Sequence, residues 1–151
     1  MGEDISKVIK QEKFKDSYQK AVINLIYTSN YFRDIHASIF SKFNIQSQHF
    51  NILRILNGQY PNPCSPGYIK NVMLDKGRDL TRLINKLVKL GWVHRQICET
   101  NRRKVELTLT PEGKEKIDNM SEILLLKEQK LKKMSDDDYE LLSTLLDKMR
   151  S

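Results

Sequence analysis

The sequence has few of the residues that cross-link or interrupt a chain: two cysteines, four prolines and six glycines among 151 residues. Two cysteines without a CxxC spacing exclude a framework of disulfide bridges and indicate a reduced intracellular protein. No apolar run approaches the ~20 residues of a membrane helix, and no basic and apolar leader opens the chain. We therefore expect a cytoplasmic protein that forms one globular domain over 1–151 and has no membrane partner.

Signatures of catalysis are missing as well. The histidines His36, His49 and His94 are scattered without an HExxH or Cys-His spacing. No glycine-rich phosphate loop occurs, and no nucleophile, base and orienting acid stand out. We expect no enzyme, no bound metal and no cofactor. Each of Cys64 and Cys98 has two interpretations, a redox sensor or a buried, incidental thiol.

The positive charge is gathered in one segment. Residues 76–104 hold nine basic and two acidic residues, which equals the whole net charge of +7, while the remaining residues carry 17 of each sign. A surface that neutralises phosphates needs such a local excess. Charge alone leaves equally open a solvated basic face without a partner.

Apolar side chains at spacings of three and four predict one long helix over 13–42, which contains no proline or glycine. A helix of up to ~30 residues is long for a small domain, so we expect part of it to pack against another chain. A second helix is expected to have Ser47 as its cap and to end at Asn57 and Gly58. Two prolines then predict a loop over 60–64.

A helix-turn-helix pattern follows this loop. Ser65 and Pro66 are typical of the start of a short helix. After a tight turn, a second helix carries apolar residues on one face until Gly91 stops it. Its other face is polar and mostly basic, with Arg78, Arg82, Asn85, Lys86 and Lys89. An apolar back and a basic front fit a helix that enters the major groove of DNA.

Two short β-prone runs, 92–97 and 104–109, predict a hairpin with a polar turn over 98–103. Arg102 and Arg103 are expected near the tip of this wing, where an arginine suits the adjacent minor groove.

Two helices are expected to close the chain. Thr110 and Pro111 give the first its cap and first position. Ser135 and three following aspartates give the second its cap and complement its dipole.

Three strings of the sequence resemble the MarR family of bacterial regulators, and the similarity covers nearly the whole chain. The string NRRKVELTLTPEGK (101–114) is similar to the family's Asp-Arg-Arg wing and the Leu-Thr-x-x-Gly start of its next helix, with Asn101 where an acidic residue is usual. The string LTRLINKLVKLGWV (80–93) resembles the recognition helix and first wing strand, and SQHFNIL (47–53) resembles the second helix.

The resemblance implies a mainly α fold with a small β-hairpin wing. A winged helix-turn-helix lobe would span 47–110, between dimerisation helices over 13–42 and 111–150. It also implies a homodimer that binds a pseudo-palindromic operator in double-stranded DNA and acts as a repressor of transcription.

A set of polar and basic side chains is expected to contact DNA. The set is Ser65, Lys76, Arg78, Thr81, Arg82, Asn85, Lys86, Lys89, Arg95, Arg102, Arg103 and Lys104. Arg78 and Arg82 fit guanine edges or phosphates. Four further side chains are expected to contact phosphates, namely Lys86, Lys89, Arg95 and Lys104. Thr81 and Asn85 fit either bases or solvent. Asp79 is expected to form an ion pair with Arg82, one turn along the helix.

Many MarR-like proteins lose affinity for DNA when a small molecule binds between the dimer helices and the DNA-binding lobe. Such an effector site would be lined here by Tyr27, Tyr31, Phe32, His36 and His49, and a packed core is the other interpretation of these residues. The alternative function is a winged-helix module that binds protein or RNA without operator specificity.

Overall fold

The structure is a computed structural model and describes residues 2–151. Residues up to Ile117 form one compact unit and residues from Asp118 onward form a second. The elements, in chain order, are α1 (Ile5–Val8), α2 (Ser17–Phe40), the 3-10 helix η1 (Ser41–Phe43), α3 (Ser47–Gln59), α4 (Pro66–Val72), α5 (Leu80–Lys89), β1 (Val93–Cys98), β2 (Asn101–Leu109), α6 (Pro111–Leu131) and α7 (Asp136–Met149). The predicted fold class, mainly α with a two-stranded wing, is confirmed, while one MarR-like domain over the whole chain stays a prediction.

The long helix α2 is shorter than its predicted range, and the short helix α1 before it was not predicted. The start of α2 is set by Asp16, whose carboxylate accepts a hydrogen bond from the backbone N–H of Gln19 at 2.8 Å. Its end is followed by η1 and by Asn44 in the left-handed conformation, with φ at 58°. Only Ile39 and Phe40 of this helix are buried.

Gln46, rather than the predicted Ser47, is the N-cap of α3, because the cap bond comes from His49. The Nδ1 atom of His49 accepts a hydrogen bond from the backbone N–H of Gln46 at 3.0 Å. The helix continues through Gly58 to Gln59, past the predicted stop.

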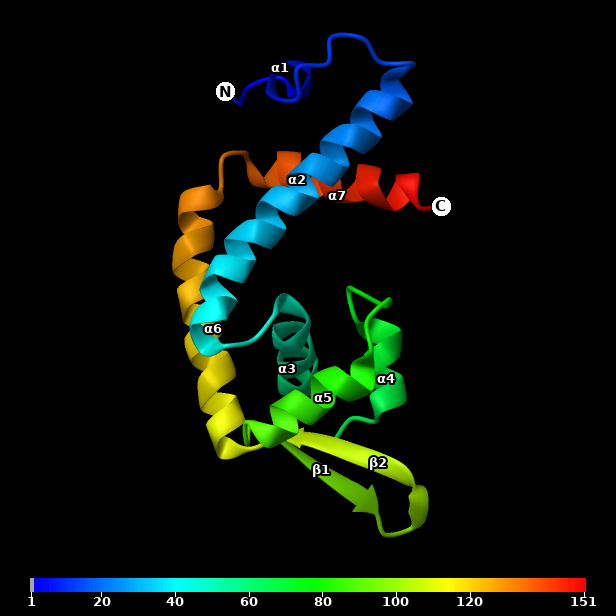
Figure 1. The fold of residues 1–151 in the computed structure, drawn as a ribbon, viewed down its shortest axis with the longest axis vertical. Helices are drawn as coiled ribbons and strands as arrows, with labels where there is room; N and C mark the ends of the chain where they lie inside the picture. Colours follow the sequence, from blue (N-terminus) through cyan, green and yellow to red (C-terminus); the bar gives the residue numbers. More distant parts are fainter. Residues whose placement is uncertain (1) are drawn as a thin grey trace. The chain divides into compact units, whose positions relative to one another are not determined.

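The core of the first unit joins α3, α4, α5 and the wing (Figure 1). Its most deeply buried side chains include Ile52, Leu53, Leu56, Ile69, Leu87, Leu107 and Ile117. The rings of Phe40 and Phe50 stack with centroids 4.6 Å apart, which fixes the end of α2 against α3. Cys64, in the predicted loop, pairs with Leu107 of β2 through two backbone hydrogen bonds of 2.9 and 2.8 Å.

The second unit holds the rest of α6 and the whole of α7. Ser135 caps α7 as predicted, and the side chain of Asp138 reciprocates by accepting from Ser135. The turn before α7 is fixed by Tyr139, whose hydroxyl accepts from the backbone N–H of Lys133 at 2.9 Å. None of the side chains of α7 is buried.

Among residues 2–151, no helix combines the length and the apolar character needed to cross a bilayer.

Candidate nucleic-acid interface

The candidate recognition helix α5 begins at Asp79, whose carboxylate accepts a hydrogen bond from the backbone N–H of Arg82 at 3.3 Å. The predicted ion pair between these two side chains is wrong, because the carboxylate is used as the N-cap. An aspartate at this position satisfies a free N–H group and interacts favourably with the helix dipole. Only the backbone N–H of Arg82 is used in this bond, and its guanidinium lies on the exposed face of the helix.

The two faces of α5 differ as the sequence predicts, except that Arg78, expected on the basic face, lies in the loop before the N-cap Asp79. Leu83, Ile84 and Leu87 are buried, which holds the helix against the core of the first unit. Eleven of the twelve predicted DNA-contacting side chains are exposed, and Lys86 is half-buried. Ser65 is among them, although its hydroxyl already accepts from the backbone N–H of Tyr68 at 3.1 Å as the N-cap of α4.

A hollow of about 330 Å³ lies where α3 and α5 begin. We call it the basic hollow, and its lining is Gln46, His49, Arg78, Asp79, Arg82, Leu83 and Lys86. Three cationic side chains and one carboxylate make its surface positive. It continues the basic face of α5 and suits a negatively charged group, such as a phosphate of a nucleic acid.

His49 is buried at the edge of this hollow, with 4% of its surface exposed. Burial, and then the positive charge of Lys86, lower the pKa of His49 from 6.5 to about 4. The imidazole is therefore neutral at neutral pH, which leaves Nδ1 free to accept the cap bond from Gln46.

We expect the protein to lose stability as the pH falls from about 6.5 to 4. Over that range the unfolded chain binds a proton at His49 and the folded chain does not, so the free energy of unfolding decreases, by about 3 kcal/mol in total. Urea unfolding at a series of pH values measures this slope.

The His49→Gln variant should have a flatter slope in the same pH window. His94→Gln, the same change at an exposed position of β1, controls for the loss of one imidazole. Equal slopes in wild type and His49→Gln would contradict the assignment.

The wing differs from its predicted boundaries near the turn. The turn consists of Glu99 and Thr100 alone, and β2 already begins at Asn101. The side chain of Asn101 accepts a hydrogen bond from the backbone N–H of Arg103 at 3.1 Å, which orders the residues that were predicted as turn. Arg102 and Arg103 consequently lie in the strand next to the tip, with both side chains exposed.

The wing is connected directly to α5. The guanidinium of Arg95 in β1 donates a hydrogen bond to the side-chain oxygen of Asn85 in α5 at 2.5 Å. Sequence reasoning placed the two residues separately, one on phosphates and the other on bases or solvent. Their contact orients Arg95 and ties the wing to the helix.

A second set of bonds joins the end of α5, the wing and α6. The hydroxyl of Thr110 donates to the carbonyl of Gly91 at 2.6 Å and accepts from the N–H of Gly113 at 3.0 Å. Its backbone N–H donates to the carbonyl of Trp92 at 3.1 Å. Gly91 has a φ of 80°, as its predicted role as a helix stop requires.

One relative with an assigned role matches part of this sequence. The chain is 34% identical over 76 residues to the HTH-type transcriptional regulator PecS of Dickeya dadantii. The match covers 50% of this chain and 46% of PecS, so it spans about half the length of that relative. No protein-family model matches the chain.

Solved structures match over most of the chain. A MarR transcription factor from Planctomyces limnophilus is 29% identical, with a TM-score of 0.69 over 89% of this chain and 98% of that one. Wild-type MarR from E. coli, in its apo form, is 26% identical, with a TM-score of 0.62 over 83% and 93%. In sequence and in fold the chain is similar to these MarR regulators. A complex of S. aureus MepR with DNA, 20% identical with a TM-score of 0.74 over 91% and 97%, has the same fold.

Of the five side chains expected to line an effector site, only His49 lines the basic hollow. Tyr27, Tyr31 and Phe32 are exposed on α2, and the rings of the last two meet edge to face at 5.3 Å. The effector site stays a prediction.

The two thiols of the chain lie in different surroundings. Cys64 is buried, and burial raises the pKa of its thiol. A hydrogen bond with Thr100 lowers the pKa of the Cys98 thiol, which lies beside the wing turn. The structure leaves both interpretations of the two cysteines open. Within the described residues, no three His, Cys, Asp or Glu side chains are grouped as a metal site requires.

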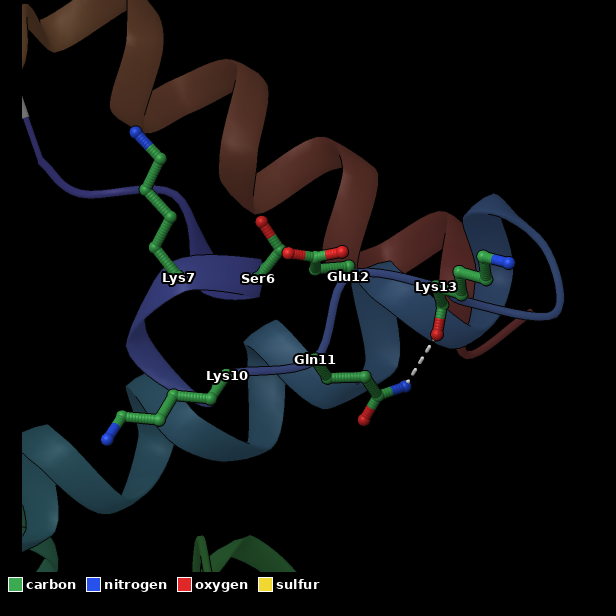
Figure 2. Close-up of a pocket in the computed structure, with 6 residues that line it drawn as sticks. All are labelled: Ser6, Lys7, Lys10, Gln11, Glu12 and Lys13. Carbon is green, nitrogen blue, oxygen red and sulfur yellow. Dashed lines mark hydrogen bonds between the residues drawn. The ribbon is translucent and has the colours of Figure 1, made fainter.

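A second hollow, near the N-terminus, is lined by Ser6, Lys7, Lys10, Gln11, Glu12 and Lys13 (Figure 2). Its lysine side chains point in different directions. The amide of Gln11 donates to the backbone carbonyl of Lys13 at 3.0 Å. The charged groups do not converge, so this surface has no arrangement for holding a ligand.

Sequence reasoning missed the contribution of the loop before α5. Asp75 accepts hydrogen bonds there from Gln48, Gly77 and Arg78. An aspartate two residues before a glycine is typical of a turn that is closed by its carboxylate, and this pattern could have identified it.

Proposed function

We propose that two copies of this chain bind a pseudo-palindromic operator in double-stranded DNA and act as a transcriptional repressor. The observation that carries the proposal is the exposed cationic face of α5 beside a wing that bears Arg102 and Arg103. A helix of this kind fits the major groove, while wing arginines suit the minor groove. The relatives are named as regulators of transcription, which supports a regulator rather than an enzyme.

The homodimer is supported by apolar surface that the single chain leaves exposed. On α2, Tyr18 is 72% exposed, and Ile26 and Tyr31 are exposed as well. On α7, Leu142 and Leu145 are exposed. Apolar surface of this extent on helices is typical of an interface with another chain. Release by a small-molecule effector and a cytoplasmic location stay predictions.

The test is selection of bound sequences from random duplex DNA, followed by fluorescence anisotropy with the selected and scrambled duplexes. We expect a preferred sequence with two half-sites, and affinity that decreases steeply with salt, since several phosphates are neutralised per subunit. Sedimentation should give a dimer at micromolar concentration. No preference among DNA sequences, or equal binding of duplex RNA, would favour the alternative winged-helix module.

Arg82→Ala and Arg103→Ala should have different effects on DNA binding. Arg82 lies on the exposed face of α5, so its loss should reduce discrimination between selected and scrambled DNA by about 10- to 100-fold. Arg103 lies in the wing, so its loss should weaken binding to both duplexes. Anisotropy with both duplexes at two salt concentrations separates the effects. Equal losses on both duplexes for Arg82→Ala would argue against base recognition by this residue.

A further inference from the structure

The loop between α4 and α5 is held to α3 at two points. The side-chain oxygen of Asn51, a buried residue, accepts from the backbone N–H of Leu74 at 2.9 Å. One turn earlier on α3, the amide of Gln48 donates to the Oδ2 atom of Asp75 at 3.3 Å. These bonds determine where the chain enters α5.

Asp75 is the centre of this loop. Its Oδ1 accepts from the backbone N–H of Gly77 at 3.1 Å, and its Oδ2 also accepts from the Nε atom of Arg78 at 3.3 Å. The bond from Gln48, then that from Gly77, and then Arg78 lower the pKa of Asp75, so the carboxylate is charged at neutral pH. A free carboxylate on a surface that meets phosphates would weaken binding by repulsion. If Asp75 favours DNA binding, it must therefore contribute something that outweighs this repulsion.

That contribution is the orientation of Arg78. The side chain is 60% exposed and lines the basic hollow together with Arg82 and Lys86. The bond to Asp75 uses Nε, which leaves the two Nη groups available for a second partner. A guanidinium held at one side is preorganised for a bidentate contact with a phosphate or a guanine edge. It loses less conformational entropy on binding than a freely rotating side chain would.

We propose that Asp75 is a positioning residue that holds Arg78 for contact with DNA, and that Gln48 supports it from α3. The inference rests on the proposed DNA binding and adds a residue of opposite charge to the interface. It predicts that removing a negative charge from this surface weakens binding, the reverse of the result expected from electrostatic repulsion alone.

The experiment is a double-mutant cycle of Asp75→Asn and Arg78→Ala, read out as affinity for the selected operator. Asparagine keeps one oxygen for the N–H of Gly77, and Gln48 can present its own oxygen to the new amide. With the oxygen of the new asparagine kept for Gly77, the NH2 group that takes the place of Oδ2 cannot accept from the Nε of Arg78. We expect Asp75→Asn to weaken binding about tenfold in the wild-type chain and to leave it unchanged or tighter in the Arg78→Ala chain.

Glu99→Gln is the matched control, since it removes a carboxylate from the wing turn, inside the basic segment 76–104 that Asp75 directly precedes. It should tighten binding slightly in both backgrounds. Arg78→Lys tests the contact from the other side, because it keeps the charge but cannot make the same bond through Nε. Its affinity should be insensitive to Asp75→Asn. Thermal unfolding of each variant separates lost folding from lost orientation.

Tighter binding by Asp75→Asn in both backgrounds, as for Glu99→Gln, would overturn the inference and leave the proposed function intact. The same holds for equal weakening by Asp75→Asn in the wild-type and Arg78→Ala chains. Absence of sequence preference in the wild-type chain would instead overturn the proposed function and, with it, this inference.

Discussion

Gly113→Ala is expected to destabilise the protein by about 3 to 5 kcal/mol, among the largest effects of any single substitution. A Cβ atom at this position would lie 1.9 Å from the carbonyl oxygen of Trp92. That oxygen cannot move away freely, because it accepts a hydrogen bond from the backbone N–H of Thr110. The substitution would therefore separate α6 from the first residues of the wing. Thermal unfolding should show a decrease in Tm of about 10 °C.

Gly58→Ala provides a matched control in α3. No atom lies within 4 Å of a Cβ at Gly58, and the residue is helical and exposed. Alanine there should stabilise the protein by up to about 1 kcal/mol, because glycine loses more backbone entropy in a helix. A Tm for Gly113→Ala equal to that of wild type would mean that α6 and the wing adjust without cost, contrary to the contact described.

The double substitution Leu142→Lys and Leu145→Lys is expected to convert the proposed dimer into monomers. Both side chains are largely exposed in the single chain, at 45% and 51%, so its own stability should change little. In a dimer interface the two lysines would bury unpaired charges, which costs several kcal/mol. Operator affinity should fall by about 100-fold or more, because a monomer binds only one half-site.

Ser143→Lys, on the other side of α7, is the control for added charge and should leave the dimer intact. Sedimentation measures the molar mass of each variant, and anisotropy measures its affinity for the operator. A dimer that persists in the Leu142→Lys and Leu145→Lys chain would exclude this face of α7 from the interface.

The helices and their caps could be predicted from the sequence where one residue decides the local geometry. Ser65, Thr110 and Ser135 act as helix caps. Gly91, with its positive φ, follows the C-cap of α5 and ends the helix. Such predictions succeed because a cap bond joins residues two or three positions apart, so the sequence contains both partners.

The predictions failed where a residue had several partners within reach. The sequence predicts an ion pair between Asp79 and the side chain of Arg82. In the structure the carboxylate of Asp79 instead accepts a hydrogen bond from the backbone N–H of Arg82 and caps the helix. Ser47 was preferred as a cap by its type, whereas the bond between Gln46 and His49 sets the start of α3. Residue type alone does not decide between such alternative partners, because the free energies of the alternative bonds differ little. The packing around the residue determines which bond forms.

By itself, the sequence determined the order of the α-helices and strands from α2 onward, the amphipathic α5 and the concentration of the net charge over 76–104. Each follows from composition or from spacing along the chain. Only the tertiary structure decided which polar groups meet: Arg95 with Asn85, and Asp75 with Gln48 and Arg78. Hydrogen bonds between segments require a distance near 3 Å and a defined direction. Neither exists until packing of α3, α5 and the wing brings the segments together.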